Sequence, residues 1–200
     1  MNFVFPDDCS EYVNAQIVQN KKNPDHYLNL SDSEYSAIKE FINDPKKIVD
    51  LGCGLGRMSV YMNHMLSSEA MYYLADSTNS IDSVKYGWNP EPAFYNDLSI
   101  TEEFCKINGL DNFKVVDITK GELDELKDID LVMSFMSVGF HYPIEGYINQ
   151  LLNITSDNAI MIFGIRKGQY DISAFDYAFS ESYIRENKID VKEELLILRK

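Results

Sequence analysis

From Lys47 onward, short apolar runs rich in strand-forming residues alternate with longer stretches whose apolar residues recur at helical spacing. Helical faces follow the first run (Met58, Tyr61, Met62 and Met65), start again near Ser99, and start once more at Pro143. Parallel neighbouring strands need crossover connections, which helices usually supply. The alternation therefore predicts an α/β fold with a doubly wound, mostly parallel sheet, whose strands lie at 48–51, 72–75, 113–116, 131–134 and 160–163, with a last one near the sheet edge at 194–198.

The first 45 residues show helical periodicity instead. A first helix is expected to contain Tyr12, Val13, Ile17 and Val18. Ser31-Asp32-Ser33-Glu34 has the form of a capping box, which predicts that a second helix begins there and ends between Asn43 and Pro45. No repeat, low-complexity tract or linker interrupts the chain. We expect a single domain over 1–200, with a helical cap at 1–45 and a core at 46–200.

Composition narrows the function classes. The formal net charge is −14, from 32 acidic and 18 basic residues, and such a field disfavours nucleic acid and anionic membranes as partners. No apolar run reaches the roughly 20 residues of a bilayer span, and the N-terminus has no basic signal-peptide segment. The three cysteines form no disulfide framework. These features predict a cytoplasmic protein with a small-molecule partner, and leave its oligomeric state open.

The strongest chemical signal is the segment 48–57, which reads Ile-Val-Asp-Leu-Gly-Cys-Gly-Leu-Gly-Arg. A strand ends there in a glycine-rich turn, and a helix follows. Gly52, Gly54 and Gly56 allow close approach of a ligand to the backbone, and Asp50 precedes them. The spacing is Gly-x-Gly-x-Gly followed by Arg57, so the dinucleotide pattern Gly-x-Gly-x-x-Gly fails. Cys53 fits as a small residue between glycines better than as a nucleophile.

Two acids follow the next two strands. Asp76 comes after the second strand, where a carboxylate can accept both hydroxyls of a ribose. Asp117 comes after the third, where its oxygen can accept the amino group of adenine while the amide of Ile118 donates to the ring. Ligands of doubly wound folds bind at the carboxyl ends of such strands. Ordinary turn chemistry is the alternative for each acid taken alone.

The loop and the two acids together resemble the class I S-adenosylmethionine-dependent methyltransferases, over residues 46 to about 165. The resemblance implies a Rossmann-like, seven-stranded methyltransferase sheet. It also implies that S-adenosylmethionine is the cofactor and S-adenosylhomocysteine the product. Asp50, Gly52, Cys53, Gly54 and Gly56 would support the methionine portion, Asp76 the ribose, and Asp117 with Ile118 the adenine.

After the fourth strand the segment 134–143 reads Ser-Phe-Met-Ser-Val-Gly-Phe-His-Tyr-Pro. In the resembled family this segment, with Phe135, lies beside the transferable methyl group. Gly-Phe-His-Tyr-Pro is also similar to sugar O-methyltransferases of bacterial surface-polysaccharide (capsule) clusters, which implies a hydroxyl acceptor of the sugar, phosphate or phosphoramidate type. His141 is the best-placed neutral-pH base for such an acceptor, and a structural histidine in a turn is the alternative. No acid cluster suggests a metal site, so we expect none.

Further acceptor contacts are expected from Tyr27, Trp88, Tyr142 and Arg166. Flat aromatic rings suit a sugar face, although such rings often simply pack in the core. Arg166 follows the fifth strand, where it can meet an anionic acceptor or remain a solvated charge. The segment 77–95 is long for a loop of a compact domain and is expected to act as a lid or binding element. Two other functions stay open, namely N-methylation of a small amine and nucleotide binding without catalysis.

Overall fold

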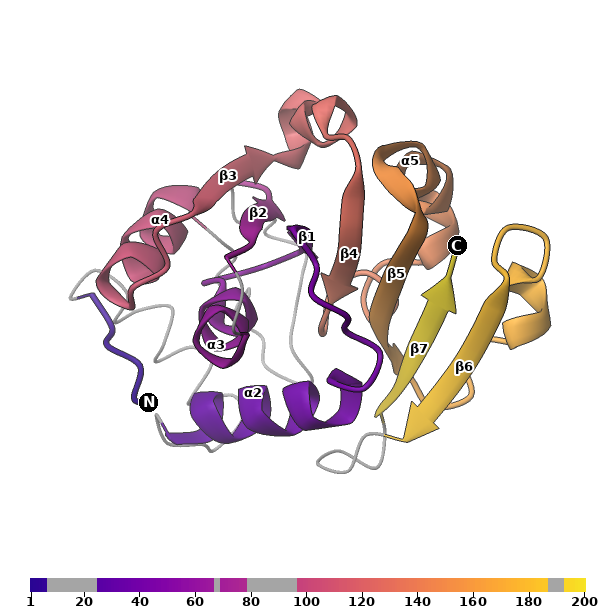
Figure 1. Cartoon of the computed structure of the whole chain (residues 1–200), viewed down its shortest axis with the longest axis horizontal. Helices are drawn as coiled ribbons and strands as arrows, with labels where there is room; N and C mark the ends of the chain where they lie inside the picture. Colours follow the sequence, from indigo (N-terminus) through magenta and orange to yellow (C-terminus); the bar gives the residue numbers. More distant parts are fainter. Residues whose placement is uncertain (7–24, 67–68, 79–96, 187–192) are drawn as a thin grey trace, which may run out of the picture.

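The computed structural model describes residues 1–6, 25–66, 69–78, 97–186 and 193–200, and these residues form one sheet with the strand order β3-β2-β1-β4-β5-β7-β6 (Figure 1). Strands β1 to β5 pair in parallel, whereas β7 is antiparallel to both β5 and β6. The sheet confirms the α/β, mostly parallel, seven-stranded fold class. Its strands are β1 (Lys47–Leu51), β2 (Met71–Asp76), β3 (Phe113–Asp117), β4 (Ile129–Ser134), β5 (Thr155–Arg166), β6 (Glu181–Glu186) and β7 (Glu193–Arg199).

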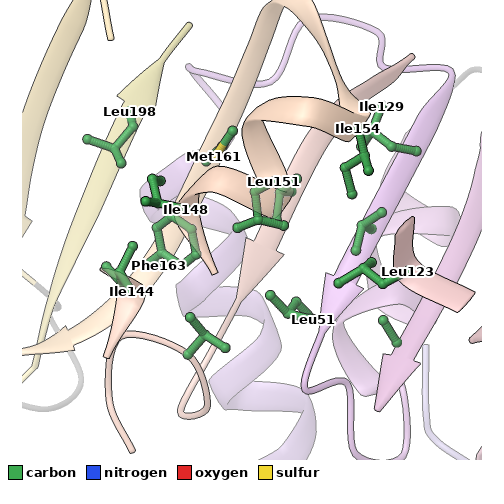
Figure 2. Close-up of a cluster of buried hydrophobic side chains, with 14 of the residues drawn as sticks. Leu51, Leu123, Ile129, Ile144, Ile148, Leu151, Ile154, Met161, Phe163 and Leu198 are labelled. Carbon is green, nitrogen blue, oxygen red and sulfur yellow. The ribbon is translucent and has the colours of Figure 1, made fainter. Parts of the chain in front are cut away.

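Alternate residues of the strands enter two separate cores, one on each face of the sheet. Ile48 of β1 packs under α2 (Asp25–Ile38), α3 (Arg57–Met65) and α4 (Leu98–Ile107). Val49, the next residue, packs on the opposite face with α5 (Ile148–Ile154). Figure 2 shows this second core, where Leu151 and Ile148 of α5 lie among side chains of β4, β5 and β7. Four short 3₁₀ helices complete the described elements, at Ile118–Lys120, Glu122–Glu125, Ile144–Gly146 and Ile172–Phe175.

The strand periodicity predicted six of the strands to within a few residues. The seventh, β6, has no apolar run because its side chains are mostly exposed at the sheet edge. Among the described residues, every helix falls short of the length and apolarity that a bilayer span requires.

Two helix starts were wrong. The helix expected to begin at Ser31 begins by Asp25 and runs through the supposed capping box, so Ser31 and Glu34 are buried residues of its interior. The Ser31 hydroxyl donates to the carbonyl of Tyr27 one turn earlier instead of capping the helix. Pro143 is followed by the 3₁₀ turn Ile144–Gly146, and α5 begins only at Ile148. The helix expected over Tyr12–Val18 lies outside the described residues.

Candidate functional site

The glycine-rich loop joins β1 to α3 at the carboxyl end of the sheet. The amides of Gly52 and Cys53 donate to the carbonyl of Ala75 in β2, at 2.7 and 3.3 Å. Gly52 has φ of 72°, and a Cβ at this position would lie 2.0 Å from Ser137 Oγ. Backbone conformation and packing therefore both require glycine here. Gly54 and Gly56 also have positive φ, and Gly56 is the N-cap of α3.

Asp76, the last residue of β2, faces this loop. Its carboxylate accepts the amide of Gly54 at 2.9 Å and the amide of Ser77 at 2.8 Å. On the other side of Gly54, the carbonyl accepts the hydroxyl of Thr101 in α4 at 2.7 Å. Gly54, the central residue of the loop, is thus held between β2 and α4. Sequence reasoning missed Thr101, whose place in a helical pattern gave no sign of this contact.

Asp117 ends β3 directly opposite Asp76, because the two residues pair in the register of the sheet. Its carboxylate accepts the amide and the hydroxyl of Thr119, at 3.0 and 2.6 Å, and lies 3.0 Å from Lys120 Nζ. The hydrogen bonds from Thr119, followed by those from Lys120, hold the pKa of Asp117 below its usual value. The side chain therefore caps the 3₁₀ turn that contains Ile118, and the adenine role of both residues stays a prediction.

Asp50 lies beneath the loop and is buried. Its carboxyl accepts the hydroxyl of Ser59 in α3 at 2.8 Å. Burial raises the pKa of Asp50 to about 7, despite the opposing effects of Ser59 and Arg57. Burial, with Asp76 and Asp50 nearby, also raises the pKa of the Cys53 thiol well above its usual value. A thiol that resists ionisation is a poor nucleophile, which agrees with its interpretation as a packing residue.

Arg57, the first residue of α3, forms a buried ion pair with Glu34 of α2. The guanidinium donates to both carboxylate oxygens, at 2.6 and 2.9 Å, and to the Ser31 hydroxyl at 3.0 Å. Burial alone would lower the pKa of Arg57, but the attraction of Glu34 outweighs it and raises that pKa. Sequence reasoning used Arg57 only to reject a dinucleotide site, and it placed Glu34 in a cap.

The segment after β4 lies against the glycine loop. The Ser134 hydroxyl donates to the carbonyl of Leu51 at 2.6 Å, and Ser137 contacts Gly52 as described above. The carbonyl of Ser137 accepts three amides, and the carbonyl of Tyr142 accepts the amide of Gly139 at 2.7 Å. These bonds fold the segment into a compact turn beside the loop. Phe135 and Tyr142 are half-buried in this turn and pack against opposite cores.

His141 is half-buried, and its ring meets Phe140 edge to face with centroids 5.0 Å apart. The guanidinium of Arg166, the last residue of β5, lies over the same Phe140 ring, 4.8 Å from its centroid. Burial, followed by the positive charge of Arg166, lowers the pKa of His141 below its usual value. The structure therefore brings a predicted base and a predicted anion contact to the same turn.

Tyr147 lies near two of the predicted site residues. Burial raises the pKa of its hydroxyl, and Tyr142 and Asp76 add to that effect. Its hydroxyl is therefore within electrostatic range of both the predicted ribose acid and a predicted acceptor residue. Its place in a helical apolar stripe predicted only a core residue.

Tyr27, a further predicted acceptor residue, lies in another part of the fold from this turn. Tyr27 lies in α2, where its ring packs against Phe5 with centroids 5.7 Å apart, and it adds to the raised pKa of Arg57. Trp88 and nearly all of the segment 77–95 lie outside the described residues. Within the described part of the chain, no three His, Cys, Asp or Glu side chains gather as metal ligands would.

Comparison with known proteins supports the fold rather than a particular family. No family model matches the sequence, and no curated protein matches it. A protein provisionally assigned as an O-methyltransferase, from Nostoc punctiforme, superposes with a TM-score of 0.62 at 15% identity, over 98% of this chain and 61% of its own. This chain thus spans less than two thirds of that protein.

Two further structures extend the comparison. Magnesium protoporphyrin IX methyltransferase from Synechocystis, solved with bound SAM, has a TM-score of 0.55 at 18% identity, over 88% of this chain and 79% of its own. An rRNA methylase from Streptococcus thermophilus has a TM-score of 0.54 at 14% identity, over 84% of this chain and 93% of its own. Magnesium protoporphyrin IX and rRNA are different methyl acceptors, and the three proteins share one architecture. The chain has the fold of S-adenosylmethionine-dependent methyltransferases.

Proposed function

We propose that this protein is an S-adenosylmethionine-dependent methyltransferase that acts on a small acceptor. The observation that carries the proposal is Asp76, whose carboxylate stands at the end of β2 and accepts the amide of Gly54 in the glycine loop. The strand order reverses at β1, between β2 and β4, and doubly wound folds bind ligands outside the strand ends at such a point.

The residues at this point fit the cofactor chemically. A carboxylate oxygen can accept from more than one donor, and the Asp76 carboxylate, which accepts the amides of Gly54 and Ser77, is the kind of group that binds ribose hydroxyls. The Asp76 carboxylate accepts the amide of Gly54, so it places a negative charge directly beside the loop. A negative charge beside the binding site favours a sulfonium cation. When bound, the cofactor supplies an electrophilic methyl group on its sulfur.

The acceptor side is proposed to bind a hydroxyl compound with an anionic group, such as a sugar, phosphate or phosphoramidate intermediate of capsule biosynthesis. Its support is that His141 and Arg166 both contact the ring of Phe140, which brings a base and a cation to one turn. The lowered pKa leaves His141 neutral near pH 7, so an unprotonated ring nitrogen can take the proton of the attacking hydroxyl. Arg166 supplies a fixed positive charge for the anionic group, and the turn orients the acceptor for in-line attack.

Calorimetric titration tests the cofactor half of the proposal. The protein should bind S-adenosylmethionine and S-adenosylhomocysteine and should not bind NAD. Asp76→Ala should weaken binding tenfold or more, since losing two charge-assisted hydrogen bonds costs on the order of 1.5–3 kcal/mol.

Asp130→Ala is the matched control for this titration. The Asp130 carboxylate also accepts two backbone amides, from Lys46 and Lys47, but at the opposite end of the sheet. The Asp130→Ala variant should bind the cofactor normally. Equal affinities of the two variants would refute the ribose assignment, and binding of NAD alone would refute the proposed activity.

A further inference from the structure

We propose that Glu34 is a positioning residue for the cofactor site, acting through Arg57, so that docking of helix α2 and binding of S-adenosylmethionine favour each other. The inference rests on the proposed function. It gives α2 a definite role, since the buried ion pair joins this helix to the residue that follows the glycine loop.

The geometry of the Arg57–Glu34 ion pair restricts how α2 and α3 can move relative to each other. Arg57 and Glu34 form a two-pronged contact, and the exposed fractions of their side chains are only 14% and 1%. Ser31 adds a third hydrogen bond to the same guanidinium. A bidentate arginine–carboxylate pair restricts orientation as well as distance. Removing the charge of Glu34 leaves a buried guanidinium without its counter-charge, which is strongly unfavourable.

Arg57 is well placed to transmit that restriction to the loop. Gly56 caps α3 with a left-handed backbone and has no side chain to accept the first amides of the helix. The start of α3 is held instead by its own side chains, Arg57 toward α2 and Ser59 toward Asp50 of β1. The loop between Asp50 and Arg57 is therefore fixed at both of its ends, and α2 provides the contact at the Arg57 end.

A second contact between the same helices offers a comparison. The hydroxyl of Tyr61 donates to Asp32 at 2.7 Å, and the ring of Tyr61 packs on Tyr35 at 5.8 Å between centroids. Tyr61 lies one turn beyond Arg57 in α3, farther from the loop. Figure 1 shows α2 next to α3, and both contacts hold the two helices together, but of the two only the Arg57 contact adjoins the loop.

The test compares two acid-to-amide changes on α2. Glu34→Gln removes the charge that faces Arg57, and Asp32→Asn removes the charge that faces Tyr61. Calorimetry measures the affinity for S-adenosylmethionine, and hydrogen exchange measures protection of residues 25–38 with and without the cofactor. We expect Glu34→Gln to weaken binding about tenfold, as typical coupling energies allow, and to abolish the cofactor-induced protection of α2. Asp32→Asn should keep both.

A third variant separates positioning from general destabilisation. Arg57→Lys keeps the positive charge but loses the two-pronged contact, so it should bind with intermediate affinity and show partial protection of α2. If Glu34→Gln is too unstable to purify, Arg57→Lys against Asp32→Asn provides the same comparison. Equal affinities and equal protection in Glu34→Gln and Asp32→Asn would overturn the inference.

Failure of the proposed function gives a different result. In that case the wild-type protein does not bind S-adenosylmethionine at all, and hydrogen exchange of the free proteins still tests the contact itself. Without any ligand, Glu34→Gln should exchange faster than Asp32→Asn at residues 53–58, which include the loop. Equal exchange there would overturn the positioning role whatever the cofactor is.

Discussion

The glycine loop and the segment after β4 are neighbours held in different ways. In the loop, Gly54 forms hydrogen bonds with Asp76 of β2 and with Thr101 of α4. Arg57, which follows the loop, is held by Glu34 of α2. The turn after β4 is folded mainly by its own amides, three of which share the carbonyl of Ser137. A loop fixed by several elements suits a ligand common to many enzymes, whereas a locally folded turn can change with the acceptor. Changes in the first region should therefore alter cofactor binding, and changes in the second should alter turnover.

The largest effect is expected from His141→Asn, in the second region. Loss of a general base should lower kcat by roughly 10²–10⁴-fold, with little change in affinity for S-adenosylmethionine. The pKa of His141 lies below the ordinary 6.5, so the wild-type rate should fall as pH drops through that lowered value, when the imidazole becomes protonated. The variant should lack this acidic limb. Steady-state rates over pH 5–8 with an active acceptor measure both effects.

Retention of most activity in His141→Asn would mean that the turn orients the acceptor without removing a proton. That result would favour an amine acceptor over a hydroxyl.

Asp50→Asn tests the buried carboxyl beneath the first region through stability. The pKa of Asp50 in the folded protein is raised from 3.8 to about 7, so between these values the folded state keeps a proton that the unfolded state has lost. The free energy of unfolding of the wild type should therefore fall as pH rises from 4 to 7, by up to roughly 4 kcal/mol. The asparagine variant, which still accepts from Ser59, should lack this slope. Urea unfolding at several pH values measures the difference.

Ser59→Ala is the control for that slope, because it removes the hydrogen bond and leaves the carboxyl in place. It should unfold more easily and keep the pH dependence. Parallel curves for the wild type and Asp50→Asn would show that the carboxyl is not the source.

Gly52→Ala tests the contact between the two regions. A Cβ there would lie 2.0 Å from Ser137 Oγ, so the alanine must push the turn away from the loop, and cofactor binding should weaken about tenfold to a hundredfold. Gly109→Ala is the matched control, since Gly109 has φ of 78° but its added Cβ would meet no atom within 4 Å. It should show the backbone strain alone, with normal binding by calorimetry.

The double variant Gly52→Ala with Ser137→Gly sharpens that test by removing the colliding side chain. Binding should recover in part, leaving only the cost of the left-handed backbone. No recovery would show that Gly52 serves the backbone alone and that the two regions are not in tight contact.

Arg166→Gln should produce the smallest effect, a rise in the pKa of His141. The positive charge of Arg166 is one of the two causes that hold this pKa down. Titration of the His141 ring protons by nuclear magnetic resonance measures the change without any acceptor. Lys167→Gln, whose cation pairs with Glu186 instead, is the control and should leave the titration unchanged. If the pKa of His141 changed equally in both variants, the charge of Arg166 would have no specific effect on His141.

The two regions also differ in how far the sequence predicts them. The glycine loop and Asp76 follow strands with a clear period, so their place at the sheet edge could be predicted from the chain alone. The pairing of Arg57 with Glu34 could not, because the two residues are 23 positions apart and meet only when α2 docks on α3. The same serine and glutamate that read as a helix cap proved to be buried partners of that arginine.

Strands show the same limit. Each buried strand has an apolar run, whereas β6 is exposed, and its partners on β7 become apparent only in the folded sheet. The nearness of Arg166 to Phe140 follows from the pairing of Ser134 with Phe163, which brings the ends of β4 and β5 together. Such contacts depend on which strands become neighbours, and local periodicity does not contain that information.

A crystal structure with S-adenosylhomocysteine tests the central claim most directly. We expect the ribose hydroxyls within hydrogen-bonding distance of the Asp76 carboxylate, the homocysteine portion along the loop from Gly52 to Gly56, and the sulfur facing the turn that contains His141. A ligand bound elsewhere, or one whose ribose does not contact Asp76, would contradict the account.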